Sequence, residues 1–157
     1  MTEAPGRVEA FSDGVFAIAI TLLILEIRVP HVEHGLWAGL LALWPSYVAF
    51  LLSFVVILIE WVNHHELLRN VRGVSYPYLF ANGLLLLTVT FVPFPTAVLA
   101  AYLGTSEAKT AVAFYCGAFV VNALLVALVQ PVIGLLINVS LWILWIRLGY
   151  REERAVR

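Results

Sequence analysis

The sequence has few charged residues and a single cysteine, and both shortages exclude classes of protein. Charged residues make up 12% of the 157 positions and apolar residues 62%, whereas soluble domains have roughly 25% and 45 to 50%. Cys116 is the only cysteine, so the chain can form neither an internal disulfide nor a site of paired thiols. This composition indicates an integral membrane protein, for which we expect no enzymatic activity and no cofactor.

Three further absences narrow the function. No long run of Lys or Arg is present, which argues against a nucleic-acid partner. The sequence TVGYG, which forms the carbonyl-lined filter of many potassium channels, is also missing. His64 and His65 lie about 100° apart on a helix, so they cannot bind one metal ion as an i, i+4 pair can. We therefore expect no bound metal.

Apolar stretches account for nearly all of the chain, and we expect an all-α, polytopic membrane protein with residues 1–157 as a single transmembrane domain. Trp44-Pro45 predicts a kink or a restart within the second stretch. Pro93 and Pro95 predict that the third helix breaks or bends. The five predicted spans are about 7–29, 36–62, 77–102, 110–129 and 131–146.

Positive charge in short loops predicts the orientation of the spans. Arg69 and Arg72 place the loop between the second and third spans in the cytoplasm, and the N-terminus with it. With five spans the tail would lie outside, although it is basic. The connection Gln130-Pro131 is also very short for two antiparallel spans. The basic tail residues are Arg147, Arg151, Arg154 and Arg157.

The first apolar stretch carries a polar pair, Ser12 and Asp13. An ionised carboxylate in a membrane helix costs about 2.5 to 3.5 kcal/mol on insertion scales, so it is normally kept where it has partners. At about 100° per residue the pair points away from an uncharged stripe. That stripe leaves two interpretations open, a face that packs on another helix or on lipid and a face that lines a pore. It consists of Phe11, Gly14, Ile18, Leu22 and Leu25.

The start of this first stretch resembles a known family. Arg7, Phe11, Ser12 and Asp13, followed by GVFAIAIT, resemble the first-helix signature of the TMEM175 family of potassium-permeable channels in its short prokaryotic form. The segments WVNHH at 61–65 and VPFPT at 92–96 support the resemblance, which extends to about Gln130. It implies a homotetramer in a prokaryotic plasma membrane that passes K⁺ and other monovalent cations.

The resemblance also implies the roles of the stripe. The first helix would line the pore, with Ile18 at the main constriction and Leu22 and Leu25 as further apolar layers. Such a ring would select an ion by how readily the ion loses water, helped by the hydroxyl of Thr21. The family has six spans, so we expect a span and its linker to be missing between Gln130 and Pro131. A sixth span would return the basic tail to the cytoplasm.

Polar residues of three spans lie at one depth in this topology. The resemblance implies that they form a network which fixes the orientation of the pore helix. The alternative is a small proton-coupled transporter, or a non-conducting membrane module, that uses Asp13 and His64. The expected network comprises Arg7, Ser12, Asp13, Asn63, His64 and Asn82.

Overall fold

The computed structural model describes residues 5–31, 35–69, 71 and 73–129. In these ranges the elements are helices. Four of the described segments are long and apolar enough to cross a membrane: Gly6–Glu26, Trp44–Arg69, Tyr76–Tyr102 and Ala108–Val126. The prediction of an all-α polytopic protein is confirmed for this part of the chain. The elements are α1 (Pro5–Leu22), the 3-10 turn η1 (Leu23–Glu26), α2 (Leu36–Ala42), α3 (Trp44–Arg69), α4 (Tyr76–Phe91), α5 (Pro93–Tyr102) and α6 (Ala108–Val129).

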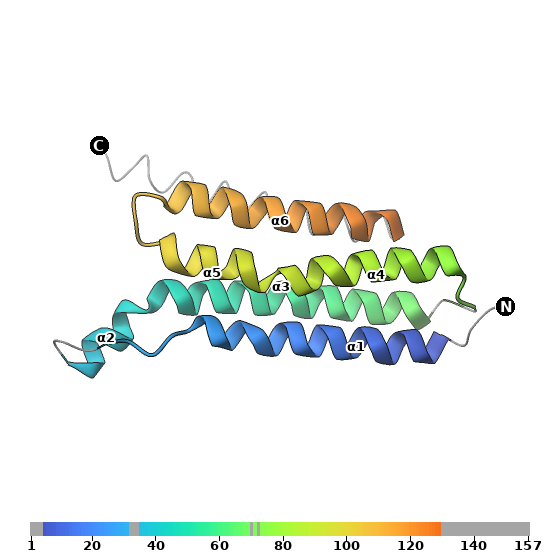
Figure 1. The fold of residues 1–157 in the computed structure, drawn as a ribbon, viewed down its shortest axis with the longest axis horizontal. Helices are drawn as coiled ribbons and strands as arrows, with labels where there is room; N and C mark the ends of the chain where they lie inside the picture. The colour runs from blue at the N-terminus through green and yellow to red at the C-terminus, as the bar shows by residue number, and fades with distance from the viewer. Residues whose placement is uncertain (1–4, 32–34, 70, 72, 130–157) are drawn as a thin grey trace.

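The long helices lie side by side in one bundle (Figure 1). α1 forms one edge and packs on α3 and α4, while α6 forms the opposite edge and packs on α4 and α5. α2 lies at the end of the bundle where α1 leads into α3. The predicted fifth span, 131–146, and the span expected between Gln130 and Pro131 lie outside the described residues.

The second span differs from the predicted 36–62. The helix stops at Ala42, restarts at Trp44 and continues to Arg69. At the break, the Leu43 N–H bonds to the Leu40 carbonyl at 3.2 Å, a tight turn, and Pro45 fits the first turn of α3 because no helical partner is needed there. The helix extends past residue 62 because its polar residues find partners on α1 and α4. The restart at Trp44 was predicted correctly, and the helix bounds differ from those of the predicted span.

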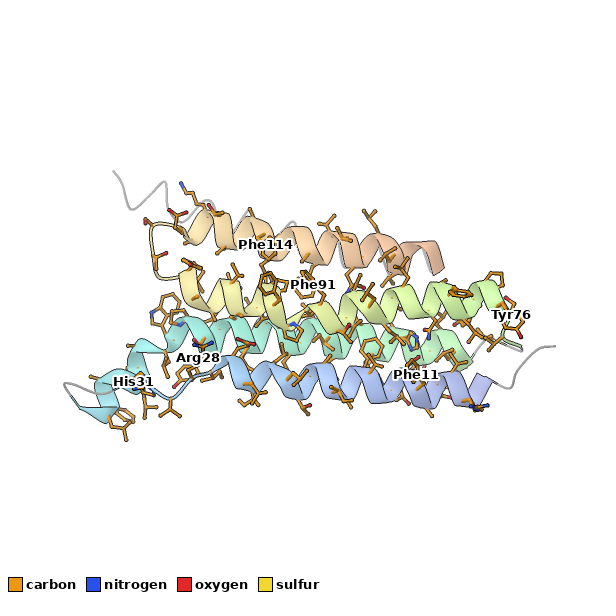
Figure 2. All side chains as sticks on the ribbon, in the orientation of Figure 1. Phe11, Arg28, His31, Tyr76, Phe91 and Phe114 are labelled. Carbon is orange, nitrogen blue, oxygen red and sulfur yellow. The ribbon has the colours of Figure 1, made fainter. Side chains whose placement is uncertain are left out.

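The break in the third span is confirmed at Val92, between α4 and α5. Pro93 cannot donate to the Val89 carbonyl, and the Val92 N–H takes that acceptor instead at 3.2 Å. α5 then starts with the Thr96 N–H bonded to the Val92 carbonyl. Three aromatic rings cluster beside this break (Figure 2), with ring centroids 5.6 and 5.8 Å apart. The rings are those of Phe91, Phe94 and Phe114.

Apolar side chains from all the long helices, including α5, form the main core, and Val8, Leu68 and Val74 form a smaller one. Small residues such as Ala19, Ala49 and Ala123 are fully buried in the main core and let the helices approach closely. α1 contributes residues three or four positions apart, so a single face of that helix is buried. These residues are Val8, Ser12, Phe16 and Ala19, followed by Leu23 in η1.

Candidate functional site

The predicted stripe of α1 is a continuous exposed face in the single chain. The side chains of Phe11, Ile18, Leu22 and Leu25 are between 42% and 68% exposed, and Gly14 between them is also exposed. α3 and α4 pack on the other side of α1, so neither covers the stripe. A second copy of the chain or lipid could therefore contact this face.

The rotation of α1 about its own axis is fixed by its buried side. Phe16 is 1% exposed and its ring centroid lies 5.4 Å from that of His64 on α3. Ser12 is fully buried one turn earlier. Turning α1 enough to bury Ile18 would expose these side chains, so the stripe faces outward as a consequence of the core packing.

Thr21 lies beside the stripe and is exposed. Its hydroxyl donates a hydrogen bond of 2.9 Å to the Ile18 carbonyl of the same helix. The donor is thereby used, while the oxygen lone pairs remain available to a water or a cation. Leu25 belongs to η1, where the helix tightens into a 3-10 turn, whereas Ile18 and Leu22 are in α1.

A buried chain of hydrogen bonds joins three helices at the N-terminal end of α1. Asn82 on α4 accepts from His64 Nε2 on α3 at 2.7 Å through its Oδ1 and donates from Nδ2 to Ser12 Oγ on α1 at 3.1 Å. All three residues are at most 6% exposed. Because an amide oxygen only accepts, the His64 hydrogen is assigned to Nε2.

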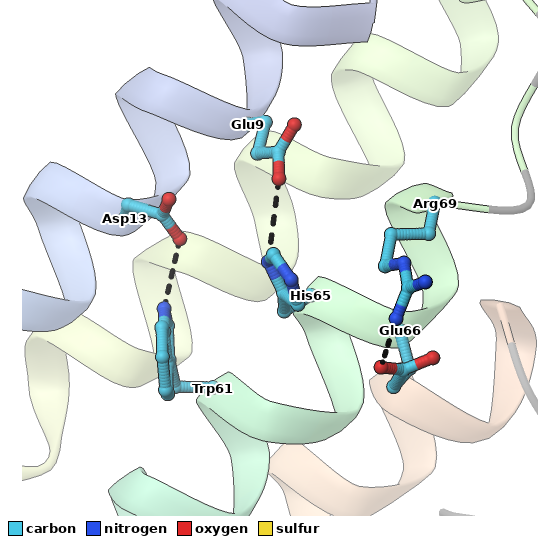
Figure 3. A network of polar contacts seen from close by, with 6 residues as sticks. All are labelled: Glu9, Asp13, Trp61, His65, Glu66 and Arg69. Carbon is cyan, nitrogen blue, oxygen red and sulfur yellow. Dashed lines mark hydrogen bonds and ion pairs between the residues drawn. The ribbon is translucent and has the colours of Figure 1, made fainter.

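Two further contacts join α1 to α3 on the side that is less deeply buried (Figure 3). Trp61 Nε1 donates to Asp13 Oδ1 at 2.8 Å, and His65 Nδ1 lies 3.3 Å from Glu9 Oε1. The rings of Trp61 and His65, one turn apart on α3, stack with centroids 5.9 Å apart. These pairs repeat at the same helical spacing on both helices, so they also fix the register of α1 against α3.

The structure does not bring every residue of the expected network together. Arg7 is exposed and Asn63 half-buried, and neither makes a polar contact with the described residues. Arg7 is about 140° around the helix from Ser12, and Asn63 about 100° from His64, so both point away from the joined faces.

Trp61 and Glu9 were not predicted as partners in this network. Their spacing held a signal for Trp61, since an indole N–H in a membrane helix needs an acceptor and Asp13 is an acceptor at the same depth. A second buried cluster was also missed: Ser53 Oγ lies 2.6 Å from Thr96 Oγ1 and 3.0 Å from the Tyr115 hydroxyl. It joins α3, α5 and α6 near the break at Val92.

Among the described residues, no group of three or more His, Cys, Asp or Glu side chains could hold a metal ion. The polar contacts near Asp13 and His64 are single donor–acceptor pairs between side chains. The geometry therefore offers two features. One is the exposed apolar face of α1. The other is the set of polar contacts behind it, the polar seam, formed by Ser12, Asp13, Trp61, His64 and Asn82.

Comparisons with known proteins agree with this architecture. A family model described as the endosomal/lysosomal potassium channel TMEM175 matches residues 7–93. A potassium channel of Chamaesiphon minutus is 56% identical over 133 residues, covering 79% of this chain and 66% of that protein. A potassium channel of Streptomyces collinus is 54% identical over 122 residues, covering 76% of this chain and 59% of that protein. The endosomal/lysosomal proton channel TMEM175 of Homo sapiens is 39% identical over 97 residues, covering 55% of this chain and 19% of that protein.

A solved structure is also similar. The crystal structure of a lysosomal potassium-selective channel TMEM175 homologue from Chamaesiphon minutus has a TM-score of 0.78 and 45% identity, covering 93% of this chain and 79% of that one. The chain spans 66% and 59% of the length of the two bacterial potassium channels. Because the family model matches more than half of the chain, and its resemblance in the first helix is confirmed, the chain belongs to the TMEM175 family.

Proposed function

We propose that the chain forms a potassium-permeable cation channel in which four copies surround a pore lined by α1. The observation that carries this proposal is the exposed apolar stripe of α1, which lies on the face opposite the core. One helix per subunit cannot enclose a path, so several copies are needed. The bacterial relatives are named potassium channels, which supports K⁺ as the ion that is transported.

Ile18 is proposed as the narrowest point of the pore. It lies near the middle of the span Gly6–Glu26 and is 60% exposed. Four sec-butyl groups around an axis would form a dry ring that an ion passes only by losing water. K⁺ loses water more readily than Na⁺, so such a ring favours K⁺ without a carbonyl filter. Leu22 and Leu25 would add apolar layers that close by dewetting.

The polar seam behind α1 is proposed to hold the pore helix in orientation. Its partners are already paired: Asp13 with Trp61 and His64 with Asn82. These bonds occupy Asp13 Oδ1 and His64 Nε2, which favours a structural role for the two residues over a proton-coupled carrier, while His64 Nδ1 is buried without a partner among the described residues. For the same reason we assign these residues to packing and not to conduction.

The proposed location is the plasma membrane of a prokaryote, with the N-terminus in the cytoplasm. The start of α1, the end of α3 and the start of α4 lie at one end of the bundle (Figure 1). Arg69 is at that end, and positive charge near span ends favours the cytoplasmic side.

The test is current through the purified protein in a planar bilayer with mixed K⁺ and Na⁺ solutions. Ile18→Asn replaces the sec-butyl groups of the ring with smaller, polar amides, so the reversal potential should move toward the non-selective value while conductance is kept or raised. The matched control is Leu124→Asn, since Leu124 is 57% exposed on α6 at the opposite edge of the bundle (Figure 1). Ile18→Asn currents equal to the parent in size and selectivity would remove α1 from the pore.

A further inference from the structure

Glu60 is an acidic residue buried inside the second span. It lies on α3, within Trp44–Arg69, and is 3% exposed. Its Oε2 accepts a hydrogen bond of 3.2 Å from Nδ2 of Asn122 on α6, which is 1% exposed. The two side chains thus contact each other at the interface of α3 and α6, on different helices from the stripe of α1.

This hydrogen bond leaves one oxygen of each side chain without a partner. Glu60 Oε1 and Asn122 Oδ1 are both buried, and neither has a hydrogen-bond partner among the described residues. Both atoms are acceptors if the acid is ionised. A buried acceptor without a donor costs about 1 to 3 kcal/mol, and more when it is charged. The pair therefore lacks one hydrogen-bond donor.

No positive charge in the described helices supplies this donor. The sequences of α4 and α5 contain no Asp, Glu, Lys, Arg or His, and the one charged residue of α6 is Lys109. Lys109 precedes Asn122 by more than three turns, or about 20 Å along the helix. An ionised carboxylate at this place would be a buried charge without a counter-ion, which is strongly unfavourable.

The neighbours on α1 and α3 supply no donor either. On α1, Asp13 pairs with Trp61 and Glu9 with His65, and Arg7 is exposed. On α3, His64 is one turn after Glu60, and its Nε2 bonds to Asn82. The buried Nδ1 of His64 has no hydrogen-bond partner among the described residues, and with the hydrogen on Nε2 it is an acceptor and not a donor. On α6, Tyr115 lies two turns before Asn122, and its hydroxyl bonds to Ser53.

We propose that Glu60 and Asn122 form a proton-binding site that ties α3 to α6. One proton on Glu60 Oε1 would turn that atom into a hydroxyl that donates to Asn122 Oδ1. With the existing bond from Asn122 Nδ2 to Glu60 Oε2, the carboxylic acid and the amide then make a closed ring of two hydrogen bonds. A single proton thereby neutralises the carboxylate and joins the two unpartnered oxygens by a hydrogen bond.

A metal cation fits the site less well. Alkali and alkaline-earth cations are held by six or more oxygens, whereas this pair offers two free ones. The proton requires only one donor and one acceptor, which is what the pair lacks. The site does not depend on α1 lining a pore, so it stands or falls separately from the proposed channel.

Infrared spectroscopy of the purified full chain at neutral pH is the direct test. The parent should show the carbonyl stretch of a protonated carboxyl group, shifted by exchange into D₂O and absent in Glu60→Gln. Glu66→Gln, on the exposed part of the same helix, should leave the band unchanged. Glu60→Asp should move the band without removing it, so the band is assigned even if Glu60→Gln does not fold. A parent that differs from Glu60→Gln only in carboxylate bands would overturn the proposal.

Thermal unfolding gives a second readout. A glutamine at position 60 can make the same two hydrogen bonds with Asn122, so Glu60→Gln should melt at the parent temperature. Asn122→Leu should melt lower, because it leaves the acid without a partner. Stabilisation of the parent by K⁺ that is lost in Glu60→Gln would show a cation site in place of the proton, and so would overturn the proposal.

Discussion

The carboxylate of Asp13 on α1 accepts a hydrogen bond of 2.8 Å from the indole N–H of Trp61 on α3. The Glu9–His65 contact lies on the same two helices, one turn earlier on α1 and one turn later on α3 (Figure 3). The network expected from the resemblance placed Arg7 with Asp13, but Arg7 makes no polar contact with the described residues. Asp13 is therefore held by a neutral aromatic donor.

This relationship predicts the behaviour of Asp13→Ala and Trp61→Phe. Each should lower the free energy of unfolding by about 0.6 to 1.7 kcal/mol, the range of polar contacts between membrane helices. Asp13→Ala should also lower the yield of the proposed tetramer, because α1 loses part of its contact with α3. A double-mutant cycle by thermal unfolding checks the pair, and strictly additive effects would show that the two side chains do not act together.

Asn82 is the central residue of the buried chain from His64 to Ser12. Asn82→Leu should destabilise the protein more than the replacement of His64 or of Ser12 alone. The reason is that Asn82→Leu leaves both of these buried polar groups without their partner. Asn63→Leu is the matched control, since Asn63 makes no polar contact with the described residues. Melting temperatures in one detergent decide the matter, and equal losses for both variants would contradict the assignment.

Thr21 separates a conduction role from a structural one. Among the described residues its hydroxyl bonds only to the carbonyl of Ile18 in the same helix, so Thr21→Val should leave the melting temperature unchanged. The pore would lose a ring of oxygens beside the constriction, and the reversal potential in mixed K⁺ and Na⁺ should move toward the non-selective value. An unaltered reversal potential in a stable Thr21→Val tetramer would remove Thr21 from the selection of ions.

Leu22 should act mainly on gating. It is 42% exposed one turn after Ile18 and would form the next apolar layer. Leu22→Asn should let water into a closed pore and raise the open probability, while selectivity at Ile18 is kept. Single-channel recording measures both quantities. A variant that changes selectivity as strongly as Ile18→Asn would place the constriction at Leu22.

Helix periodicity was sufficient to group the stripe of α1 on one face, and the family resemblance, not the periodicity, implied that this face stays outside the core. Ile18 and Leu25 are exposed because Ser12 and Phe16, on the other side, are buried. Proline chemistry was likewise sufficient for the break at Val92, because a missing N–H acts locally.

The contacts between helices were harder to predict. Which side chains meet depends on the rotation and register of two helices, and neither follows from the composition of one. Ser53 reaches Tyr115 and Glu60 reaches Asn122 only because α3 and α6 lie at one particular register. α3 extends past the predicted span end for the same reason, since its polar last turns are held by partners on other helices.

The side of the membrane on which the tail lies remains a prediction, and cysteine labelling can test it. Cys116 is the only native cysteine, so Cys116→Ser gives a suitable background. Gly73→Cys lies before α4 and Ser106→Cys before α6, at opposite ends of the bundle (Figure 1). With the N-terminus inside, an impermeant thiol reagent applied outside intact cells should label Ser106→Cys and leave Gly73→Cys unlabelled.

Arg151→Cys then reports on the tail, which lies outside the described residues. The four basic tail residues favour the cytoplasm, so Arg151→Cys should behave like Gly73→Cys if a further span precedes 131–146 in the native chain. The intact mass of the expressed protein should then exceed that of the 157 residues. Labelling of Arg151→Cys from outside, with a mass equal to that of the 157 residues, would instead establish five spans, and the missing span between Gln130 and Pro131 would be wrong.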